Sequence, residues 1–402
     1  MAREGFAVEA ASEMLLSLTK PVRDVETVLL HDVLGRVAAE TTPARHDQPP
    51  FDRSPLDGFA FSHLDAAEAG PDNPARLRIV ADIFAGDAGV DRLERGQAVR
   101  ILTGAPIPPG ATCVVRQEDV TVENGTVAVP VRLGEYDNYC FRGEYLAKGA
   151  VLVDRGSRVD RGRLALLAGD GMDRLPVFRR PRVAVLSTGN ELRSGPGPLA
   201  PGEIFDGNAP LLAARVGELG ASVTVCRAVP DDAGRIATAM NELLAACDLL
   251  VTTGGVSVGD RDCLPEAGRL AGMRQVFHGV QVKPGSPALA LEKEGKLAVC
   301  LSGNPFAAFV TFELLAAPVV RRLCGLSDAT SSRVACRLGE VFPKAGGTRR
   351  FAPARLEGGK VFFSGKAGSR SLATLVDCNC LVDIPAGKTG LPAGSPVEAV
   401  LL

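Results

Sequence analysis

Tryptophan is absent from this sequence of 402 residues, and tyrosine and histidine are rare, with three and four residues respectively. A chain this poor in Trp and Tyr offers no aromatic stacking platform. The four histidines lie far apart, which argues against a metal site built from histidine. The ten cysteines are scattered, and only Cys378 and Cys380 are close together, so we expect reduced thiols rather than a zinc site.

Long apolar runs and long runs of one charge are also missing. No segment reaches the roughly 18–20 consecutive apolar residues that a membrane-spanning helix needs. Glu4, Glu9 and Glu13 interrupt the apolar residues at the N-terminus, so we expect no signal peptide and a cytoplasmic protein. The 45 basic and 47 acidic residues nearly cancel. These absences argue against a surface that binds nucleic acid or an anionic membrane, and favour a small-molecule substrate.

The length predicts roughly two to four domains, and the apolar pattern changes along the chain accordingly. Helical spacing over 9–18, 30–38 and 161–168 indicates parts of an extended helical support. Short β-like runs over 77–84, 97–103, 112–117 and 126–131, separated by Gly, Pro and Asp, predict a small β-rich domain. After Gly325 the chain returns to short strands and turns, which predict a separate β domain.

Between these parts, strands and helices alternate. We expect strands over 183–187, 222–229, 249–253 and 297–301, and helices over 209–219, 234–246 and 307–324. Such alternation predicts a parallel sheet with right-handed crossovers. Ligands of open parallel sheets bind at the carboxyl ends of the strands, so the residues that follow each strand are the first candidates for a site.

Glycine-bearing turns follow three of these strands. Glycine lets backbone N–H groups approach an anion closely, and hydroxyls add donors, so the turns predict a phosphate cradle. They match neither the Walker nor the dinucleotide-binding pattern. The candidate binding residues in these turns are Ser187, Thr188, Gly189, Gly254, Gly255, Ser257, Ser302, Gly303, Asn304 and Pro305.

Carboxylates accompany the turns, with Lys283 nearby; they are Glu191, Asp206, Asp231, Asp232, Asp260 and Asp262. Carboxylate oxygens beside a phosphate cradle would hold Mg²⁺, which suggests phosphoryl or nucleotide-linked chemistry. A purely structural interpretation is that Asp231 and Asp232 cap the following helix and that Glu191 is solvated. Of these carboxylates, we regard Asp262 and Glu191 as the stronger candidates for a chemical role.

Several motifs resemble one family. Residues 51–60, FDRSPLDGFA, resemble the S-A-M-D-G-Y-A signature of MoeA and of the homologous gephyrin E domain. Residues 101–108 and 138–144 resemble the next two blocks of that family. The turns S-T-G-N-E-L and G-G-V-S-V-G-x-x-D, the D-x-N of Asp206 and Asn208, and the K-P-G and G-N-P motifs follow in the family's order. The resemblance to the MoeA family covers essentially the whole chain.

The resemblance implies a multidomain α/β plus β fold with an elongated protomer. It implies an extended helical support domain (1–45 and 141–180), an inserted β-rich domain (46–140), a MogA-like three-layer α/β domain (181–325) and a C-terminal β barrel (326–402). It also implies a homodimer whose active cleft is shared between subunits.

The resemblance further implies a Mg²⁺-dependent molybdopterin molybdenumtransferase that inserts molybdenum from molybdate into adenylylated molybdopterin and releases AMP. A MogA-type adenylyltransferase would be a partner. The implied catalytic residues are Asp57, Glu191, Asp232, Asp262 and Lys283, of which Asp57, Glu191 and Asp262 would bind the metal. Thr103, Asp206, Asn208 and Ser369 join the turn residues in binding, and Phe59, Tyr139 or Tyr145 could flank a pterin or adenine ring.

Four positions depart from the family pattern. The mildest change is Ser302, which replaces a proline and can still donate a hydrogen bond at the turn. Tyr145 stands where an aspartate is usual, Ser286 replaces a lysine, and Pro353 replaces an arginine. These changes leave open a divergent paralogue that handles tungstate or binds the cofactor without turnover. A scaffold role like that of gephyrin and an unrelated nucleotide hydrolase also stay open.

Overall fold

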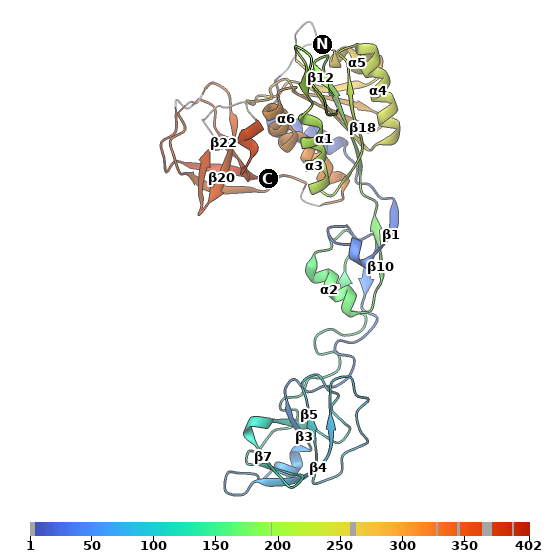
Figure 1. The fold of residues 1–402 in the computed structure, drawn as a ribbon, viewed down its shortest axis with the longest axis vertical. Coiled ribbons are helices and arrows are strands. Elements are labelled where there is room, and N and C mark those ends of the chain that lie inside the picture. The colour runs from blue at the N-terminus through green and yellow to red at the C-terminus, as the bar shows by residue number, and fades with distance from the viewer. Residues whose placement is uncertain are drawn as a thin grey trace.

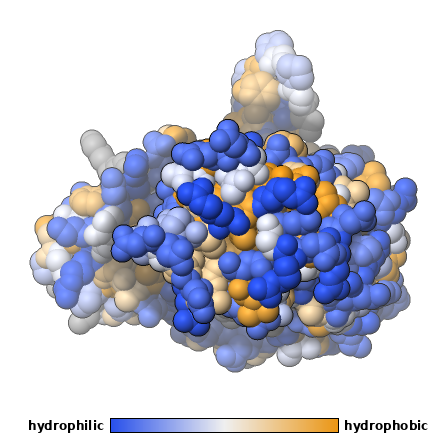
Figure 2. Space-filling view, turned by 90° about the horizontal axis from the view of Figure 1, so that it is seen from below, coloured by the Kyte–Doolittle hydropathy of each residue, from blue (hydrophilic) through white to orange (hydrophobic). Residues whose placement is uncertain are grey.

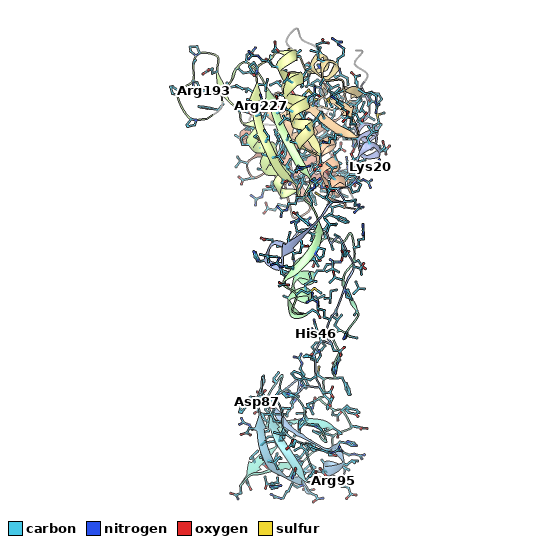
Figure 3. All side chains as sticks on the ribbon, turned by 90° about the vertical axis from the view of Figure 1, so that its right-hand side faces the viewer. Lys20, His46, Asp87, Arg95, Arg193 and Arg227 are labelled. Carbon is cyan, nitrogen blue, oxygen red and sulfur yellow. The ribbon has the colours of Figure 1, made fainter. Side chains whose placement is uncertain are left out.

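The computed structural model describes residues 5–193, 195–257, 263–326, 329–343, 346–363, 372–387 and 390–402. The chain is elongated, with an α/β domain and a β barrel at one end, a narrow support in the middle, and a β domain at the far end (Figure 1). Figure 3 shows the same long axis from the side, with His46 between the support and the β domain. Seen along this axis, the surface mixes hydrophilic residues with small apolar patches (Figure 2).

The β domain is a six-stranded sheet in the order β6-β3-β5-β4-β8-β7. Its strands are β3 (Gly58–Phe61), β4 (Ala75–Ile83), β5 (Gln97–Ile101), β6 (Cys113–Arg116), β7 (Thr121–Glu123) and β8 (Thr126–Val129), with 3₁₀ turns at His63–Ala66 and Gln117–Asp119. Successive side chains of β3 point to opposite faces, so Phe59 and Phe61 enter one apolar cluster and Ala60 enters another. The domain thus buries both faces of its sheet.

The support is built mainly from paired strands. β1 (Val25–Leu29) pairs with β10 (Arg174–Phe178), β2 (Thr42–Pro43) pairs with β9 (Val151–Val153), and α2 (Arg161–Gly169) packs beside them. The helix expected over 30–38 is wrong: only a 3₁₀ turn, Leu30–Asp32, forms there. Gly35 has a φ of +77°, outside the right-handed helical region, and the chain continues extended.

The first helix, α1 (Val8–Leu18), forms as expected but does not belong to the support. Its buried face, Val8, Ala11 and Leu15, joins the core of the α/β domain, where it packs beside α7 (Ala317–Leu323). The expectation of a mainly helical support is therefore corrected. An amphipathic pattern shows that a helix is buried on one side, but not which domain buries it.

The α/β domain has a six-stranded sheet in the order β14-β11-β15-β18-β17-β16. Its strands are β11 (Arg182–Thr188), β14 (Ser222–Val229), β15 (Leu249–Thr253), β16 (Arg274–His278), β17 (Leu289–Lys293) and β18 (Lys296–Leu301). Its helices include α3 (Asn208–Glu218), α4 (Ala233–Ala246), α5 (Leu264–Leu270) and α6 (Pro305–Thr311). Apolar clusters on both faces of the sheet give the expected three layers.

The sheet is mixed rather than parallel, which corrects the sequence-based expectation. β14, β11, β15 and β18 run parallel, whereas β17 is antiparallel to both β16 and β18. Glu294 and Gly295 join β17 to β18 with positive φ angles of 53° and 77°, as a type I′ hairpin requires. The functional edge is unaffected, because the four parallel strands still end on the same side.

The C-terminal domain is a closed barrel in the order β19-β21-β20-β22-β23. Its strands are β19 (Arg333–Leu338), β20 (Arg350–Glu357), β21 (Lys360–Phe363), β22 (Cys380–Ile384) and β23 (Pro396–Leu401), with a 3₁₀ turn at Leu372–Leu375. Phe351, Leu381 and Val400 point into the α/β core cluster, which attaches the barrel to that domain. Within the described ranges, no helix is both long and apolar enough to cross a membrane.

A buried ion pair lies where the expected helix 307–324 is interrupted by a π-helical segment, Phe312–Ala316. Glu313 is fully buried, and its two carboxylate oxygens accept from the Arg215 guanidinium at 2.6 and 3.1 Å. Replacing Arg215 with Met should cost about 3–5 kcal/mol of stability, because a buried carboxylate then loses its cation. Denaturant unfolding would measure this cost. The double variant R215M/E313L should recover most of it, and a cost below about 1 kcal/mol for R215M alone would contradict this role of the pair.

Candidate active site

The expected strand-end turns meet at one edge of the α/β sheet. The carboxyl ends of β11, β15 and β18 surround a cavity of about 330 Å³. Its walls are Ser187, Thr188, Glu191, Leu192, Ile204, Phe205, Asp206, Gly207, Asn208, Asp231, Thr253, Gly254, Gly255, Gly303 and Pro305. Parallel strands place their carboxyl ends together, which is why residues far apart in sequence converge here.

Asn208, the first residue of α3, connects two of these turns to the start of that helix. Its Nδ2 donates to Thr253 Oγ1 at 2.7 Å and to the Gly303 carbonyl at 2.9 Å. Thr253 Oγ1 in turn donates to the Ser302 carbonyl at 3.1 Å. The amide therefore fixes the turns after β15 and β18 relative to the start of α3.

Three buried polar atoms of the cavity walls have no hydrogen-bond partner among the described residues. They are Ser187 Oγ, Thr188 Oγ1 and Asn208 Oδ1. Buried hydroxyl and amide oxygens normally have partners, because leaving one unsatisfied costs about 1–3 kcal/mol. Their presence in a cavity marks the places where a polar ligand would complete the hydrogen bonding.

The cavity also depends on close contact between two turns. Gly254 has a φ of +98°, and a Cβ added there would lie 2.2 Å from the Thr188 carbonyl oxygen. A Cβ at Gly303 would lie 3.3 Å from the Gly254 Cα. Glycine is thus required at Gly254, and a side chain at Gly303 would be tightly packed against the same turn.

Two predicted binding residues also cap helices. Asp206 Oδ1 accepts from the backbone N–H groups of Asn208 and Ala209 at 3.0 and 3.1 Å, at the start of α3. Asn304 caps α6 by accepting from the Ala307 N–H at 3.1 Å, with Pro305 at the first helical position. Their side chains shape the cavity rim by fixing where the helices begin.

The two adjacent aspartates after β14 make different contacts. Asp231 lines the cavity and exchanges hydrogen bonds with Asn190. Asp232 instead caps α4, where its Oδ1 accepts from the Arg235 N–H at 2.7 Å. Asp232 is not among the cavity walls, and its catalytic role stays a prediction, whereas Asp231 lines the same cavity as exposed Glu191.

Asp57 and Thr103 lie in the β domain. Asp57 Oδ1 accepts from both the backbone N–H and the hydroxyl of Thr103, at 2.7 and 2.6 Å. These hydrogen bonds hold the pKa of Asp57 below its usual value, so the carboxylate stays ionised at neutral pH. The next residue, Gly58, is required because a Cβ there would lie 1.8 Å from the Val115 carbonyl oxygen.

One chain does not bring the predicted metal set together. The β domain with Asp57 and the α/β domain with Glu191 lie at opposite ends of the molecule (Figure 1). Asp262 and Ser369 lie outside the described residues, and Ser257, which is exposed, is not among the cavity walls. Within the described ranges, no cluster of three or more His, Cys, Asp or Glu side chains could hold a metal ion.

Lys283 lines a second cavity, of about 400 Å³, together with Ser286, Thr348, Arg349 and Glu9. The Lys283 N–H donates to the Arg349 carbonyl at 2.9 Å, and its carbonyl accepts from the Phe351 N–H at 3.0 Å. The backbone of Lys283 therefore joins the α/β domain to the barrel. The sequence placed Lys283 beside the phosphate cradle, whereas it is not among the residues that line the first cavity.

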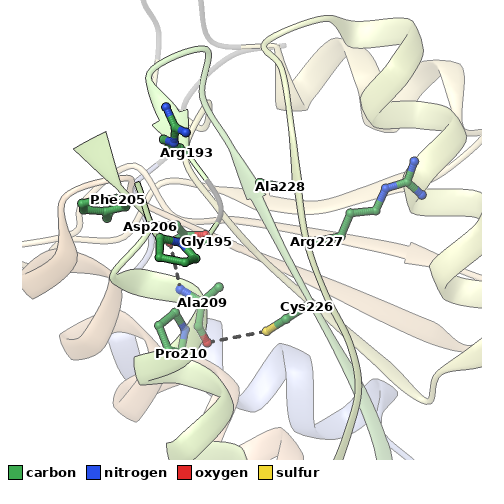
Figure 4. Close-up of a pocket in the computed structure, with 10 residues that line it drawn as sticks. Arg193, Gly195, Phe205, Asp206, Ala209, Pro210, Cys226, Arg227 and Ala228 are labelled. Carbon is green, nitrogen blue, oxygen red and sulfur yellow. Dashed lines mark hydrogen bonds between the residues drawn. The ribbon is translucent and has the colours of Figure 1, made fainter. Parts of the chain in front are cut away.

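A third cavity, of about 430 Å³, was not predicted from the sequence (Figure 4). It lies beyond Asp206, between α3, β14 and the arm that carries β12 (Leu192–Arg193) and β13 (Ile204–Phe205). Figure 3 shows this arm, marked by Arg193, projecting from the α/β domain. Both arginines of the cavity are already engaged: Arg193 by the Pro198 carbonyl and Arg227 by Glu242, each at 2.7 Å.

Family models match three successive parts of the chain. They are the MoeA N-terminal region (domain I and II) over residues 6–171, a probable molybdopterin binding domain over 184–322, and the MoeA C-terminal region (domain IV) over 335–402. The chain belongs to the MoeA family. Together with the three-layer domain and the closed barrel, these matches confirm the predicted fold class.

Relatives of known name support the same assignment. A molybdopterin molybdenumtransferase of Bacillus subtilis is 37% identical over 387 residues, covering 94% of this chain and 90% of that protein. One of Staphylococcus aureus is 34% identical over 379 residues, covering 93% and 90%. A molybdopterin biosynthesis MoeA protein of Pyrococcus horikoshii superposes with a TM-score of 0.85 at 28% identity, covering 99% and 100%. None of these comparisons supports a binding protein without turnover.

The structure shows the surroundings of the positions that depart from the MoeA pattern. Tyr145 is 63% exposed, and the Arg53 guanidinium lies 5.2 Å from its ring centre. Ser286 lines the second cavity with Lys283, and Pro353 is buried in β20. Phe59 is buried in the β-domain core, so the suggestion that it flanks a ligand ring is wrong.

Proposed function

We propose that the protein transfers molybdenum from molybdate to adenylylated molybdopterin and releases AMP. The observation that carries this proposal is the cavity at the carboxyl edge of the sheet, whose buried Ser187, Thr188 and Asn208 oxygens have no partner within the described part of the chain. Hydroxyl groups can donate to phosphate oxygens, so a phosphate in this cavity would satisfy Ser187 Oγ and Thr188 Oγ1. Asn208 Oδ1 only accepts, so it would need a hydroxyl or N–H donor from another part of the ligand. The named relatives carry the same activity in their names.

Different residues of the chain would bind the adenylyl phosphate and the molybdate. The turns after β11, β15 and β18 would bind and orient the adenylyl phosphate, and Asn208 holds the turns after β15 and β18 in place. Preorganised donors of this kind stabilise charge without further rearrangement. Lys283, exposed in the second cavity, would attract molybdate, which is an anion.

Mg²⁺ fits the carboxylates that line the first cavity. Glu191 and Asp231 offer hard oxygen atoms, and Mg²⁺ is usually held by one or two carboxylates plus substrate phosphates. When bound, the ion would neutralise charge on the phosphate. Glu191 is exposed and reachable from solvent, while Asn190 fixes the position of Asp231.

We further propose that two subunits share each site. Asp57 and Thr103 form a rigid pair in the β domain, at the far end of the chain from Glu191. They can reach the same ligand as Glu191 only if a second subunit brings its β domain to the cavity. A cytoplasmic homodimer that receives its substrate from a MogA-type adenylyltransferase fits this arrangement.

AMP release by the purified full chain tests the proposed function. Adenylylated molybdopterin and Mg²⁺ are incubated with and without molybdate, and AMP is quantified by chromatography. The proposal predicts release that requires molybdate. Tight pterin binding without AMP release, or hydrolysis of free ATP without pterin, would overturn it.

The adjacent aspartates provide a matched pair of variants. Asp231→Asn should raise the Mg²⁺ concentration needed for half-maximal AMP release by about tenfold or more, because it removes a charge beside Glu191. Asp232→Asn should leave this concentration and the stability unchanged, since Asn caps a helix as well as Asp does. Equal effects of the two variants on the Mg²⁺ requirement would contradict the assignment.

A further inference from the structure

Lys283 and Arg350 face each other across a backbone pairing that joins the α/β domain to the barrel. They form an isolated parallel bridge, in which both the N–H and the carbonyl of Lys283 are hydrogen-bonded to the barrel strand on either side of Arg350. Paired residues of neighbouring strands direct their side chains to the same face. The register therefore places two cationic side chains on the same face of the pairing.

Neither cation has an acidic partner in the part of the chain that the structure describes. Lys283 is exposed, and no hydrogen bond or ion pair of its ammonium is present within the described ranges. Arg350 is half-buried, and its Nε is buried without a hydrogen-bond partner. A buried guanidinium N–H without an acceptor is costly, which points to an acceptor that arrives with a ligand.

The acidic groups close to this strand pair are engaged elsewhere. Asp383 accepts from Arg349 at 2.7 Å and from Arg333 at 2.9 Å. Glu9 accepts from Arg349 at 2.6 Å. The neighbouring arginine, Arg349, is thus neutralised, whereas the positive charges of Lys283 and Arg350 remain uncompensated within the described residues.

We propose that Arg350 and Lys283 together bind a tetrahedral oxyanion dianion. Arg350 would contribute a planar fork that contacts two oxygen atoms, and Lys283 a point charge. Ser286, which lines the second cavity with Lys283, stands where the family has a second lysine. Arg350 is not among the walls of that cavity, but as the bridge partner of Lys283 it would add a second positive charge on the same face of the strand pairing. The proposal rests on the proposed function and names Arg350 as a binding residue for that reaction.

Equilibrium dialysis of the full chain against molybdate tests this directly, without requiring turnover. Arg350→Gln and Lys283→Gln should each weaken molybdate binding by about tenfold or more. Arg350→Lys should retain part of the affinity. Arg355→Gln is the matched control: it removes an exposed arginine of the same strand, which pairs only with Glu357 among the described residues, and should change affinity less than about twofold.

Inorganic phosphate is dialysed in parallel, because a substrate phosphate shares the tetrahedral dianion chemistry. Tighter binding of molybdate assigns the pair to the metal oxyanion, and tighter binding of phosphate assigns it to the substrate; both retain the site. Wild-type affinity of a folded R350Q variant for both anions would overturn the proposal. So would a wild-type chain that binds neither.

The two proposals fail separately. If wild-type protein releases AMP in a molybdate-dependent reaction and R350Q shows the same half-saturating molybdate concentration, only the role of Arg350 is wrong. If wild-type protein binds molybdate through Arg350 but releases no AMP, only the proposed function is wrong.

Discussion

A mixture of two inactive variants, Asp57→Ala and Glu191→Ala, is expected to recover about a quarter of the wild-type rate of AMP release. Each variant alone should lose about a hundredfold or more, because each removes a carboxylate from the reacting centre. In one chain the β domain, which carries Asp57, and the α/β domain, which carries Glu191, lie at opposite ends of the molecule (Figure 1). The two residues can cooperate only when they come from different subunits.

The size of the recovery follows from random pairing. About half of the dimers in an equal mixture carry one copy of each variant. In such a dimer one site combines two intact halves, and the other combines two defective halves. One active site in half of the dimers gives about a quarter of the full rate.

The control is a mixture of Asp57→Ala with Thr103→Val. Both residues lie in the β domain and hydrogen-bond to each other, so every mixed site keeps one defect. This mixture should stay as inactive as its components. If the mixture of Asp57→Ala and Glu191→Ala behaves in the same way, although size analysis shows mixed dimers, the shared site is contradicted.

Gly254→Ala should damage both folding and ligand binding. The added methyl group would lie 2.2 Å from the Thr188 carbonyl oxygen, so one of the two turns must move. The φ of +98° adds strain for any residue with a Cβ. We expect a loss of about 2–4 kcal/mol in stability, together with AMP affinity reduced by about tenfold or more.

Gly125→Ala separates the two causes of this loss. Gly125 also has a positive φ, +73°, but no atom lies within 4 Å of the position of an added Cβ. This variant should lose only the conformational part, about 1–2 kcal/mol, and bind AMP normally. Thermal unfolding and calorimetric AMP titration of both variants measure the difference. Equal stability and affinity would show that the contact with Thr188 is unimportant.

Local patterns predicted most of the elements of the α/β domain. The strands β14 and β15 occupy the expected residues, 222–229 and 249–253, because each is an apolar run bounded by turn residues. The reversal at β17 was missed because Glu294 occupies a left-handed turn position that usually carries Asn, Asp or Gly. The burial of α1 in the α/β core was missed because amphipathicity does not identify the partner surface.

The part of the candidate site that lies at the carboxyl ends of the parallel strands was predictable from the sequence. Ser187, Thr188, Gly254 and Gly303 meet because parallel strands share one edge. The choice between Asp231 and Asp232 depends on which side chain points to the helix N-terminus, and a sequence cannot give that direction. Arg350 was missed for a related reason: its pairing with Lys283 joins two domains that are distant in sequence.

The most direct test of the proposed site is a crystal structure of the full chain with AMP and tungstate, whose heavy atom is located by anomalous scattering. We expect the AMP phosphate against Ser187 and Thr188, tungsten beside Lys283 and Arg350, and the β domain of a second subunit over the cavity. AMP in the third cavity, between α3 and β14, or tungsten remote from Lys283, would contradict the proposed site.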